Sequence, residues 1–387
     1  MKKLLLLAWL LVASHLSFAS EKPKVCLNMI IKNESHVITR CLESVKPLID
    51  YWVIVDTGST DGTQDIVREF MKDIPGELHE RPWIHFEHNR NEALQLAESK
   101  AEYLLFIDAD DIYTYDSDFV RPEFNRDAYS VKIRYGGLTY YRVQMIRANT
   151  GWKWVGAVHE VLVAPNMGDQ AILDGVTMVI IGGGDRSNDP KKYQKDAALL
   201  ETAVERNPFC TRSVFYLAQS YRDAGMLEES ITNYEKRVRM GGWDQEVFVS
   251  LYQMGLIKES MGKSEDQIVQ AYTDAFTFRP TRAEPLYRLS AYYRKHDNHL
   301  LSYLTAKHGL SLREPNDPLF VETWIYDFGL LFEFSISSYY VGKYEESYRA
   351  CKKLLARPDL PPSIRECVER NIQYSIPKVP HLVNAAP

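Results

Sequence analysis

A cluster of carboxylates follows a short apolar run in the first third of the chain. Asp108, Asp110 and Asp111 come directly after Tyr103–Ile107. A short apolar run of this kind is typical of a buried strand, so the carboxylates are expected at a strand end. Hard divalent cations bind such oxygens, and Mg²⁺ takes only one or two from the protein beside water and substrate phosphates. The pattern indicates a divalent cation site, although acidic pairs also end strands as solvated turns.

A second polar string runs from Asp56 to Thr63, after the apolar residues 52–55. Asp56 can accept hydrogen bonds from a base or a sugar hydroxyl. Gly58 and Gly62 allow tight turns, and the polar residues between them can cap a helix that begins at Thr63. A plain strand–turn–helix connection needs one cap and one glycine but not the whole string, so a ligand-binding loop is predicted.

Two further groups have the right chemistry for a site. Arg90 is a fixed cation that could face a diphosphate or the carboxylate cluster. His159 can complete a metal shell as a neutral imidazole, and Glu160 can act as a general base. Each has a plainer alternative, namely a surface arginine for Arg90 and a structural pair for His159 with Glu160.

Strand and helix patterns alternate in the part of the chain that carries these residues. Strands are predicted at 25–31, 52–55 and 103–107, and helices at 34–45, 63–72 and 89–99. This alternation predicts an α/β domain with a mostly parallel sheet, whose ligands bind at the carboxyl ends of the strands. Residues 128–181 are rich in β-type and aromatic residues, and turns are expected at their glycines.

After the three glycines at 182–184 the pattern becomes helical and continues to about residue 375, with short breaks. A common spacing of small and aromatic residues runs through Ala218, Tyr221, Gly225, Ser230 and Tyr234 and is echoed in Ser338, Gly342, Ser347 and Cys351. A weaker copy runs through Ser290, Tyr293 and Ser302. Helix pairs packed through small residues resemble degenerate tetratricopeptide repeats. The alternative is an irregular bundle with coincidental spacing.

Length and composition set the broad class. The 387 residues favour two domains, and 45% hydrophobic with 25% charged residues is an ordinary globular composition. The net charge of −6 gives no reason to expect nucleic acid as a partner. Five cysteines are too few and too scattered for a disulfide framework. We expect domains at 21–187 and 188–387.

Residues 1–20 have the pattern of a cleaved secretory signal peptide. Lys2 and Lys3 precede an apolar run, and Ala19 ends a small-x-small site. A secreted or periplasmic protein is therefore predicted, with a membrane anchor and a cytosolic catalytic domain as the alternative. Periplasmic export is in tension with any substrate that exists only in the cytosol.

Taken together, the motifs resemble glycosyltransferase family 2, whose members have the GT-A fold. They are residues 28–34, 56–63, 90–91, 108–111 and 158–160. The match is closest to the branch with a helical tetratricopeptide-type extension, which includes sublancin-type S-glycosyltransferases, and residues 215–221 and 241–243 look like that extension.

The resemblance implies a nucleotide-diphospho-sugar donor, with a UDP-sugar favoured, and an inverting transfer. The nucleotide would be held by the set Ile30, Lys32, Asn33, Glu34, Asp56, Ser59, Arg90 and Asp108. Asp110 would bind Mn²⁺ or Mg²⁺, with His159 as the candidate for a further metal ligand. Glu160, or alternatively Asp111, would be the catalytic base. Two features depart from the family, since no aromatic residue stands near Lys32 and the late metal-binding histidine has no fixed counterpart.

Two functions follow as hypotheses. The first is a glycosyltransferase whose helical half presents a protein or peptide acceptor, since tetratricopeptide arrays bind extended peptides in a groove. The second is a catalytically weak transferase domain that serves as a scaffold or partner-binding module. A homodimer formed through the helical half is a further hypothesis.

Overall fold

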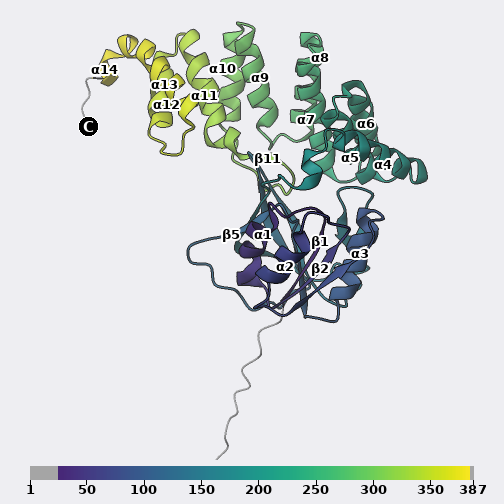
Figure 1. Cartoon of the computed structure of the whole chain (residues 1–387). Coiled ribbons are helices and arrows are strands. Elements are labelled where there is room, and N and C mark those ends of the chain that lie inside the picture. Colours follow the sequence, from purple (N-terminus) through teal and green to yellow (C-terminus); the bar gives the residue numbers. More distant parts are fainter. Residues whose placement is uncertain (1–24, 384–387) are drawn as a thin grey trace, which may run out of the picture.

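The computed structural model describes residues 25–383, so the predicted signal peptide at 1–20 lies outside the described residues. An α/β domain lies beside a long array of helices, which follow one another side by side in chain order (Figure 1). Within residues 25–383, no helix is both long and apolar enough to cross a membrane.

The α/β domain begins with alternating strands and helices and then becomes β-rich. Its elements are β1 (Val25–Ile31), α1 (Ile38–Val45), β2 (Tyr51–Asp56), α2 (Thr63–Phe70), β3 (Gly76–Glu80), α3 (Phe86–Ala97), β4 (Tyr103–Phe106), β5 (Ile112–Tyr115), β6 (Ala128–Tyr135), β7 (Leu138–Arg147), β8 (Lys153–Val155), β9 (Val161–Val163) and β10 (Gln170–Val179).

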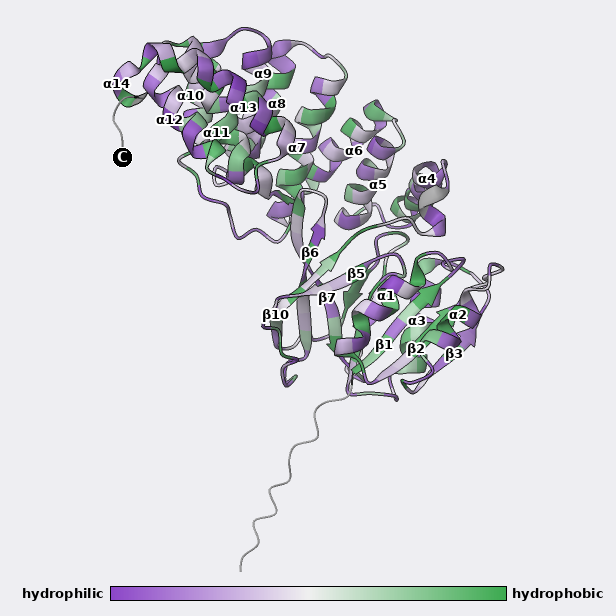
Figure 2. Ribbon diagram, turned by 60° about the vertical axis from the view of Figure 1, so that its left-hand side comes forward, coloured by the Kyte–Doolittle hydropathy of each residue, from purple (hydrophilic) through white to green (hydrophobic). Residues whose placement is uncertain are grey.

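One mixed sheet organises the domain, in the order β3-β2-β1-β4-β7-β6-β10-β5. The first four strands are parallel, whereas β7 runs antiparallel to both β4 and β6. Strands β1, β2 and β4 consist almost wholly of buried residues, in keeping with the hydrophobic colouring at the centre of the sheet (Figure 2). The predicted α/β fold class is confirmed.

Element boundaries show where the sequence patterns were incomplete. β1 has the predicted bounds, but the helix predicted from Glu34 begins only at Ile38. A turn precedes it, in which the carbonyl of Glu34 accepts hydrogen bonds from the N–H groups of Val37 and Ile38. β3 was not predicted, since its sequence GELHE is polar and none of its residues is buried.

Helices dominate the rest of the chain. They are α4 (Lys192–Arg206), α5 (Thr211–Asp223), α6 (Leu227–Met240), α7 (Asp244–Ser260), α8 (Glu265–Phe278), α9 (Glu284–Lys295), α10 (His299–Gly309), the π-helical turn η3 (Ile325–Gly329), α11 (Leu330–Tyr340), α12 (Tyr344–Leu355), α13 (Pro362–Ser375) and α14 (Pro380–Val383).

The repeated small residues lie where paired helices cross. Ser230 donates to the carbonyl of Ala218 at 2.8 Å, Ser290 to that of Ser302 at 3.0 Å, and Ser347 to that of Ser335 at 2.7 Å, each across a separation of twelve residues. These hydroxyls are buried, and each has its hydrogen-bonding requirement met by a backbone carbonyl of the partner helix. The tetratricopeptide-like helix pairs are thus present, and Ser335 has in α11 the position that Ala218 has in α5.

The helical half also contributes a strand to the sheet of the α/β domain. β11 (Val321–Glu322) pairs antiparallel with β7, Val321 opposite Thr139 and Glu322 opposite Leu138. The long segment between α10 and η3 that carries β11 corrects the expectation of uninterrupted helix with short breaks. Two residues inside a helical stretch have no strand signal of their own, so the sequence pattern could not reveal them.

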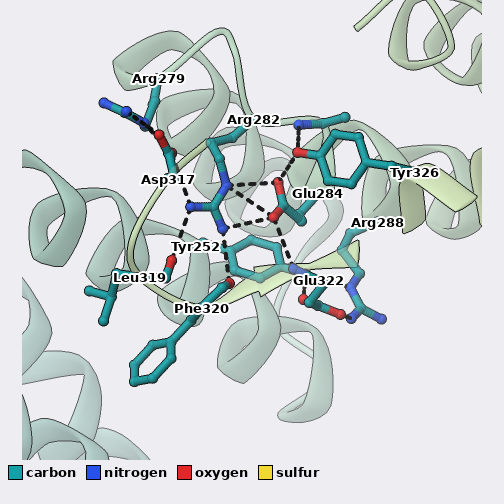
Figure 3. Close-up of polar contacts among 11 residues, drawn as sticks. Tyr252, Arg279, Arg282, Glu284, Arg288, Asp317, Leu319, Phe320, Glu322 and Tyr326 are labelled. Atoms are coloured by element: carbon teal, nitrogen blue, oxygen red, sulfur yellow. Dashed lines mark hydrogen bonds and ion pairs between the residues drawn. The ribbon is translucent and has the colours of Figure 1, made fainter. Parts of the chain in front are cut away.

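A buried ionic cluster fixes this segment to the helices (Figure 3). Arg282 is 1% exposed and forms ion pairs with Glu284 at 2.7 Å and with Asp317 at 3.3 Å. The same guanidinium donates to the carbonyls of Leu319 and Phe320, directly before β11. Burying charges is costly unless each is paired and hydrogen-bonded, and here the network satisfies both conditions.

Replacing Arg282 tests this cluster. Arg282→Met leaves the fully buried carboxylate of Glu284 without its cation, and we expect the free energy of unfolding to fall by about 3–5 kcal/mol. Urea unfolding measures the change. Arg239→Met is the matched control, because Arg239 is exposed and its ion pair with Glu235 is 3.8 Å long. Equal stabilities of the two variants would contradict the assigned role of the cluster.

Candidate functional site

The loops after β1 and β2 are joined into one surface at the carboxyl ends of the strands. The backbone N–H of Asn33 donates to the hydroxyl of Ser59 at 2.8 Å, and the side chain of Asn33 accepts from the N–H of Thr60 at 2.9 Å. Asn33 takes a left-handed backbone with a φ of 55°, which asparagine tolerates better than most residues. Ile30 lies at the end of β1, and Lys32 is exposed beyond it.

Asp56 presents one unused carboxylate oxygen to this surface. The side chain is 1% exposed, and its Oδ1 accepts the backbone N–H groups of Gly58 and Ser59, both at 2.9 Å. Its Oδ2 is buried and has no hydrogen-bond partner in the described protein. A buried acceptor without a donor is costly, so this oxygen fits an N–H or O–H group of a ligand.

Arg90, on α3, joins two carboxylates that come from different parts of the chain. Its Nη2 lies 2.6 Å from Oδ1 of Asp108, which follows β4, and its Nε lies 3.2 Å from Oε2 of Glu160. The guanidinium also packs over the ring of Trp154, 4.9 Å from the centroid. Of the two options drawn from the sequence, the structure places Arg90 against carboxylates.

The pKa values of the two carboxylates bridged by Arg90 shift in opposite directions. Burial acts to raise the pKa of Asp108, but the charges of Arg90 and Arg142 prevail and hold it below its ordinary value. For Glu160 burial prevails over the charge of Arg90, and the pKa is raised. Oε1 of Glu160 is buried without a partner. Glu160 therefore has a free oxygen and the raised basicity of a proton acceptor.

Asp110 and Glu34 face a shared position beside Gly184. The N–H of Gly184 donates to Oδ2 of Asp110 at 3.1 Å, and Oε2 of Glu34 is buried without a partner. A Cβ at Gly184 would lie 3.0 Å from both of these oxygens, so a side chain there would crowd the carboxylates. Burial and then the charge of Asp110 raise the pKa of Glu34 to about 7.

These two carboxylates agree with the oxygen chemistry of Mn²⁺ or Mg²⁺, which needs only one or two protein ligands when substrate phosphates complete the shell. Across the described residues, no three His, Cys, Asp or Glu side chains are arranged to hold a metal ion together. The assignment of Asp110 and His159 as metal ligands stays a prediction.

Asp111 is less suited than Glu160 to the role of base. Its side chain is buried, and burial together with the charges of Asp108 and Asp110 raises its pKa to about 8. Unlike Glu160, Asp111 has no buried carboxylate oxygen without a partner. The choice of Glu160 as the catalytic base stays a prediction.

The helical half holds the segment that contains His159 and Glu160. The ring of His159 stacks on that of Tyr216 from α5, with centroids 4.3 Å apart and an angle of 20° between the planes. Arg212, also on α5, donates to the carbonyl of His159 at 2.9 Å. Val158 is buried in a core formed with residues of α4 and α5. The backbone of His159 is left-handed, with a φ of 56°, and these contacts hold it there.

Several of these site residues were not found from the sequence. Tyr216 and Arg212 read as ordinary helix residues, and Gly184 as part of a linker. None of them has a local signal, because each matters only through contacts with residues that are distant along the chain. Residues 128–181 are rich in aromatic residues, but their composition does not indicate that Trp154 packs against Arg90.

A substitution at Tyr216 tests whether α5 holds this segment. Tyr216→Ala removes the stacked ring, and the strained backbone of His159 costs of the order of 1–3 kcal/mol without such support. We expect faster amide hydrogen exchange in residues 156–161, measured by mass spectrometry. Tyr216→Phe keeps the ring and should exchange like the unmodified chain. Unchanged exchange in the alanine variant would show that the contact does not restrain the segment.

Comparison with known proteins agrees with this geometry. Residues 26–120 match the family model described as "Glycosyl transferase family 2". The glycosyltransferase SunS of Bacillus subtilis (strain 168) is 27% identical over 240 residues, which cover 56% of this chain and 55% of SunS. The chain therefore spans about half the length of the curated relatives it matches first. A TPR repeat-containing protein of Synechococcus elongatus is 35% identical over 88 residues, 23% of this chain and 21% of that protein.

Similarity to solved structures is weaker. Residues 1–349 of Staphylococcus aureus TarS, solved in complex with UDP-GlcNAc, align over 66% of this chain and 91% of that one, with 13% identity and a TM-score of 0.34. A tetratricopeptide repeat protein from Parabacteroides merdae aligns over 51% of this chain and 75% of that one, with 16% identity and a TM-score of 0.37. The family match thus covers the first part of the α/β domain, residues 26–120, and the helices that follow that domain form a tetratricopeptide-like array.

Proposed function

We propose that this protein transfers a sugar from a nucleotide-diphospho-sugar to an acceptor. The observation that carries the proposal is the arrangement around Arg90, which joins Asp108 at the end of β4 to Glu160 within a family 2 domain. Asp56, which would bind the nucleotide, and Glu160 each have a buried carboxylate oxygen without a partner, and the carboxyl ends of strands are where sheets of this kind bind ligands.

The free oxygen of Asp56 can accept a hydrogen bond from the base of the donor. The ring N–H of uracil is one such donor group. This contact, with the family resemblance, supports a UDP-sugar donor. Asn33 and Ser59 hold the loop beside the base, and Asp108 would approach the ribose.

A divalent cation would be held by Asp110, with Glu34 beside it and His159 as the further ligand named from the sequence. When bound, the ion would offset the charge of the leaving diphosphate. The rest of the chemistry belongs to the chain itself. Glu160 would remove the proton of the acceptor for attack opposite the diphosphate, which inverts the anomeric centre. Arg90 fixes one oxygen of Glu160 and leaves the other for that proton.

We propose that the acceptor is a protein or peptide. The helical half contacts, through α5, the segment that contains the catalytic base Glu160, and tetratricopeptide-like arrays bind extended peptides. A homodimer through the helices and an exported or anchored location remain part of the proposal. The scaffold alternative predicts normal partner binding with no consumption of any donor.

The nucleotide part of the proposal is tested at Asp56. In Asp56→Asn the remaining oxygen can still accept from Gly58 and Ser59, while the amide would turn an N–H group toward the base. We expect UDP affinity to fall by about 1–3 kcal/mol, measured by calorimetry. Asp65→Asn, on the exposed side of α2, is the control and should bind UDP normally. Equal affinities in both variants would remove Asp56 from the nucleotide site.

The role of Glu160 as the catalytic base is tested through the pH dependence of sugar transfer. Glu160 must be deprotonated to act, and its raised pKa moves the rise of kcat/KM with pH upward from the ordinary glutamate value of about 4.3. Glu160→Gln should lower kcat by about 10²–10⁴-fold and abolish that rise, while UDP affinity is retained. A glutamine variant with full turnover would show that another group accepts the proton.

A further inference from the structure

The segment that leads from the sheet to the helices crosses the carboxylates proposed to hold a cation. We call residues 182–186, which lie between β10 and α4, the clasp. Within it, the buried Gly184 donates its backbone N–H to Oδ2 of Asp110 at 3.1 Å. A Cβ on Gly184 would lie 3.0 Å from that oxygen and 3.0 Å from Oε2 of Glu34. The clasp therefore rests directly on both carboxylates.

Two side chains at the start of α1 hold the clasp from one side. Nη2 of Arg40 donates to the carbonyl of Gly182 at 2.6 Å and to the carbonyl of Asp110 at 2.8 Å. The ring nitrogen Nε2 of His36 forms a hydrogen bond of 2.6 Å with the carbonyl of Gly183. Both side chains are exposed, so these bonds are exchanged readily for bonds to water.

Arg186 holds the other end of the clasp. It forms an ion pair with Asp196 of α4, whose side chain is 3% exposed. Its guanidinium carbon lies 4.5 Å from the centroid of the ring of Phe86, the first residue of α3. The clasp is thus anchored on the helical half at Arg186, whereas hydrogen bonds to the three glycines hold the end that lies on the carboxylates.

Two glycines give the clasp a place to turn. Gly182 and Gly183 have φ values of 72° and 93°, in the left-handed region that favours glycine. Among residues 25–383, no heavy atom beyond its chain neighbours lies within 4 Å of the Cβ that Gly182 would carry, and for Gly183 the nearest is Nη2 of Arg40 at 4.0 Å. Packing does not fix these two residues, so rotation about them can lift Gly184 from the carboxylates without disturbing a core.

We propose that the clasp opens to admit a divalent cation to Asp110 and Glu34, and that its closed arrangement excludes the cation. When the clasp is closed, the N–H of Gly184 points the positive end of its dipole at Oδ2 of Asp110, and the glycine backbone fills the space beside Oε2 of Glu34. A cation at these oxygens would meet both a like charge and an occupied position. The inference rests on the proposed function, since it takes Asp110 and Glu34 as the cation site.

Competition of this kind sets the measured affinity for the cation. The affinity is reduced by the fraction of molecules in which the clasp is open, so weakening a clasp contact should raise it. One hydrogen bond of ordinary strength corresponds to about a two- to tenfold change in such an equilibrium.

Binding of Mn²⁺ to the full chain, followed by loss of the free-ion signal in electron paramagnetic resonance, tests the competition. In Gly184→Ala the new Cβ crowds both carboxylates only while the clasp is closed, and the φ of −62° at this position suits alanine. His36→Ala removes one bond of the clasp and leaves Asp110 and Glu34 unchanged. We expect both variants to bind Mn²⁺ about two- to tenfold more tightly. His381→Ala, an exposed histidine of α14, is the control and should bind Mn²⁺ like the unmodified chain.

Hydrogen exchange, measured by mass spectrometry, gives a second readout. Saturating Mn²⁺ should speed amide exchange in residues 180–186, because the N–H of Gly184 loses its acceptor. Slower or unchanged exchange there would overturn the proposal, and so would weaker or unchanged Mn²⁺ binding in both variants or no Mn²⁺ binding in any of these proteins. Melting temperatures check that the variants are folded. UDP binding in EDTA is measured in parallel, and its absence would count against the proposed function, since that contact needs neither the cation nor the clasp.

Discussion

The bridge that Arg90 makes between Asp108 and Glu160 is the constraint on which the site depends. One carboxylate follows β4, the other comes from the region between β8 and β9, and Arg90 joins the two by ion pairs. Trp154 covers the guanidinium and keeps it between them. The two carboxylates on Arg90 differ in their pKa values. The pKa of Asp108 is lowered, whereas that of Glu160 is raised, and Glu160 keeps an unpaired oxygen.

The helical half is a structural part of this site and not a separate appendage. α5 holds His159 by ring stacking and by a hydrogen bond, and β11 extends the sheet at β7. The buried cluster around Arg282 fixes the segment that leads into β11. The helical half therefore contacts the α/β domain at two places, at the His159 segment through α5 and at the sheet through β11.

Sequence patterns were sufficient where the chemistry is local. The apolar run that became β1 has the predicted bounds, and the polar strings after β2 and β4 lie at the carboxyl ends of strands as expected. The spacing of small residues correctly predicted the helix pairs, because a serine at a crossing is required by packing at fixed intervals.

Patterns failed where a residue acts through a distant partner. Gly184 contacts Asp110 across 74 positions, and nothing around the glycine reveals that it must leave room for two carboxylates. In the sequence Tyr216 looks like an ordinary packing residue of a helix. Its stacking on the ring of His159 is a tertiary contact that the sequence pattern does not indicate. β3 and β11 lack strand signals, since one is polar and the other has two residues. Such features are fixed by tertiary contacts, which local composition does not record.

The most direct measurement for the central claim is release of the nucleoside diphosphate from a panel of nucleotide sugars, with and without Mn²⁺, by the unmodified chain and by Asp110→Ala. Sugar transfer predicts metal-dependent release of one nucleotide, UDP by preference, and its loss in the variant. No release from any nucleotide sugar, with candidate acceptor peptides present, would contradict transferase activity and leave the helical surface as the functional part of the molecule.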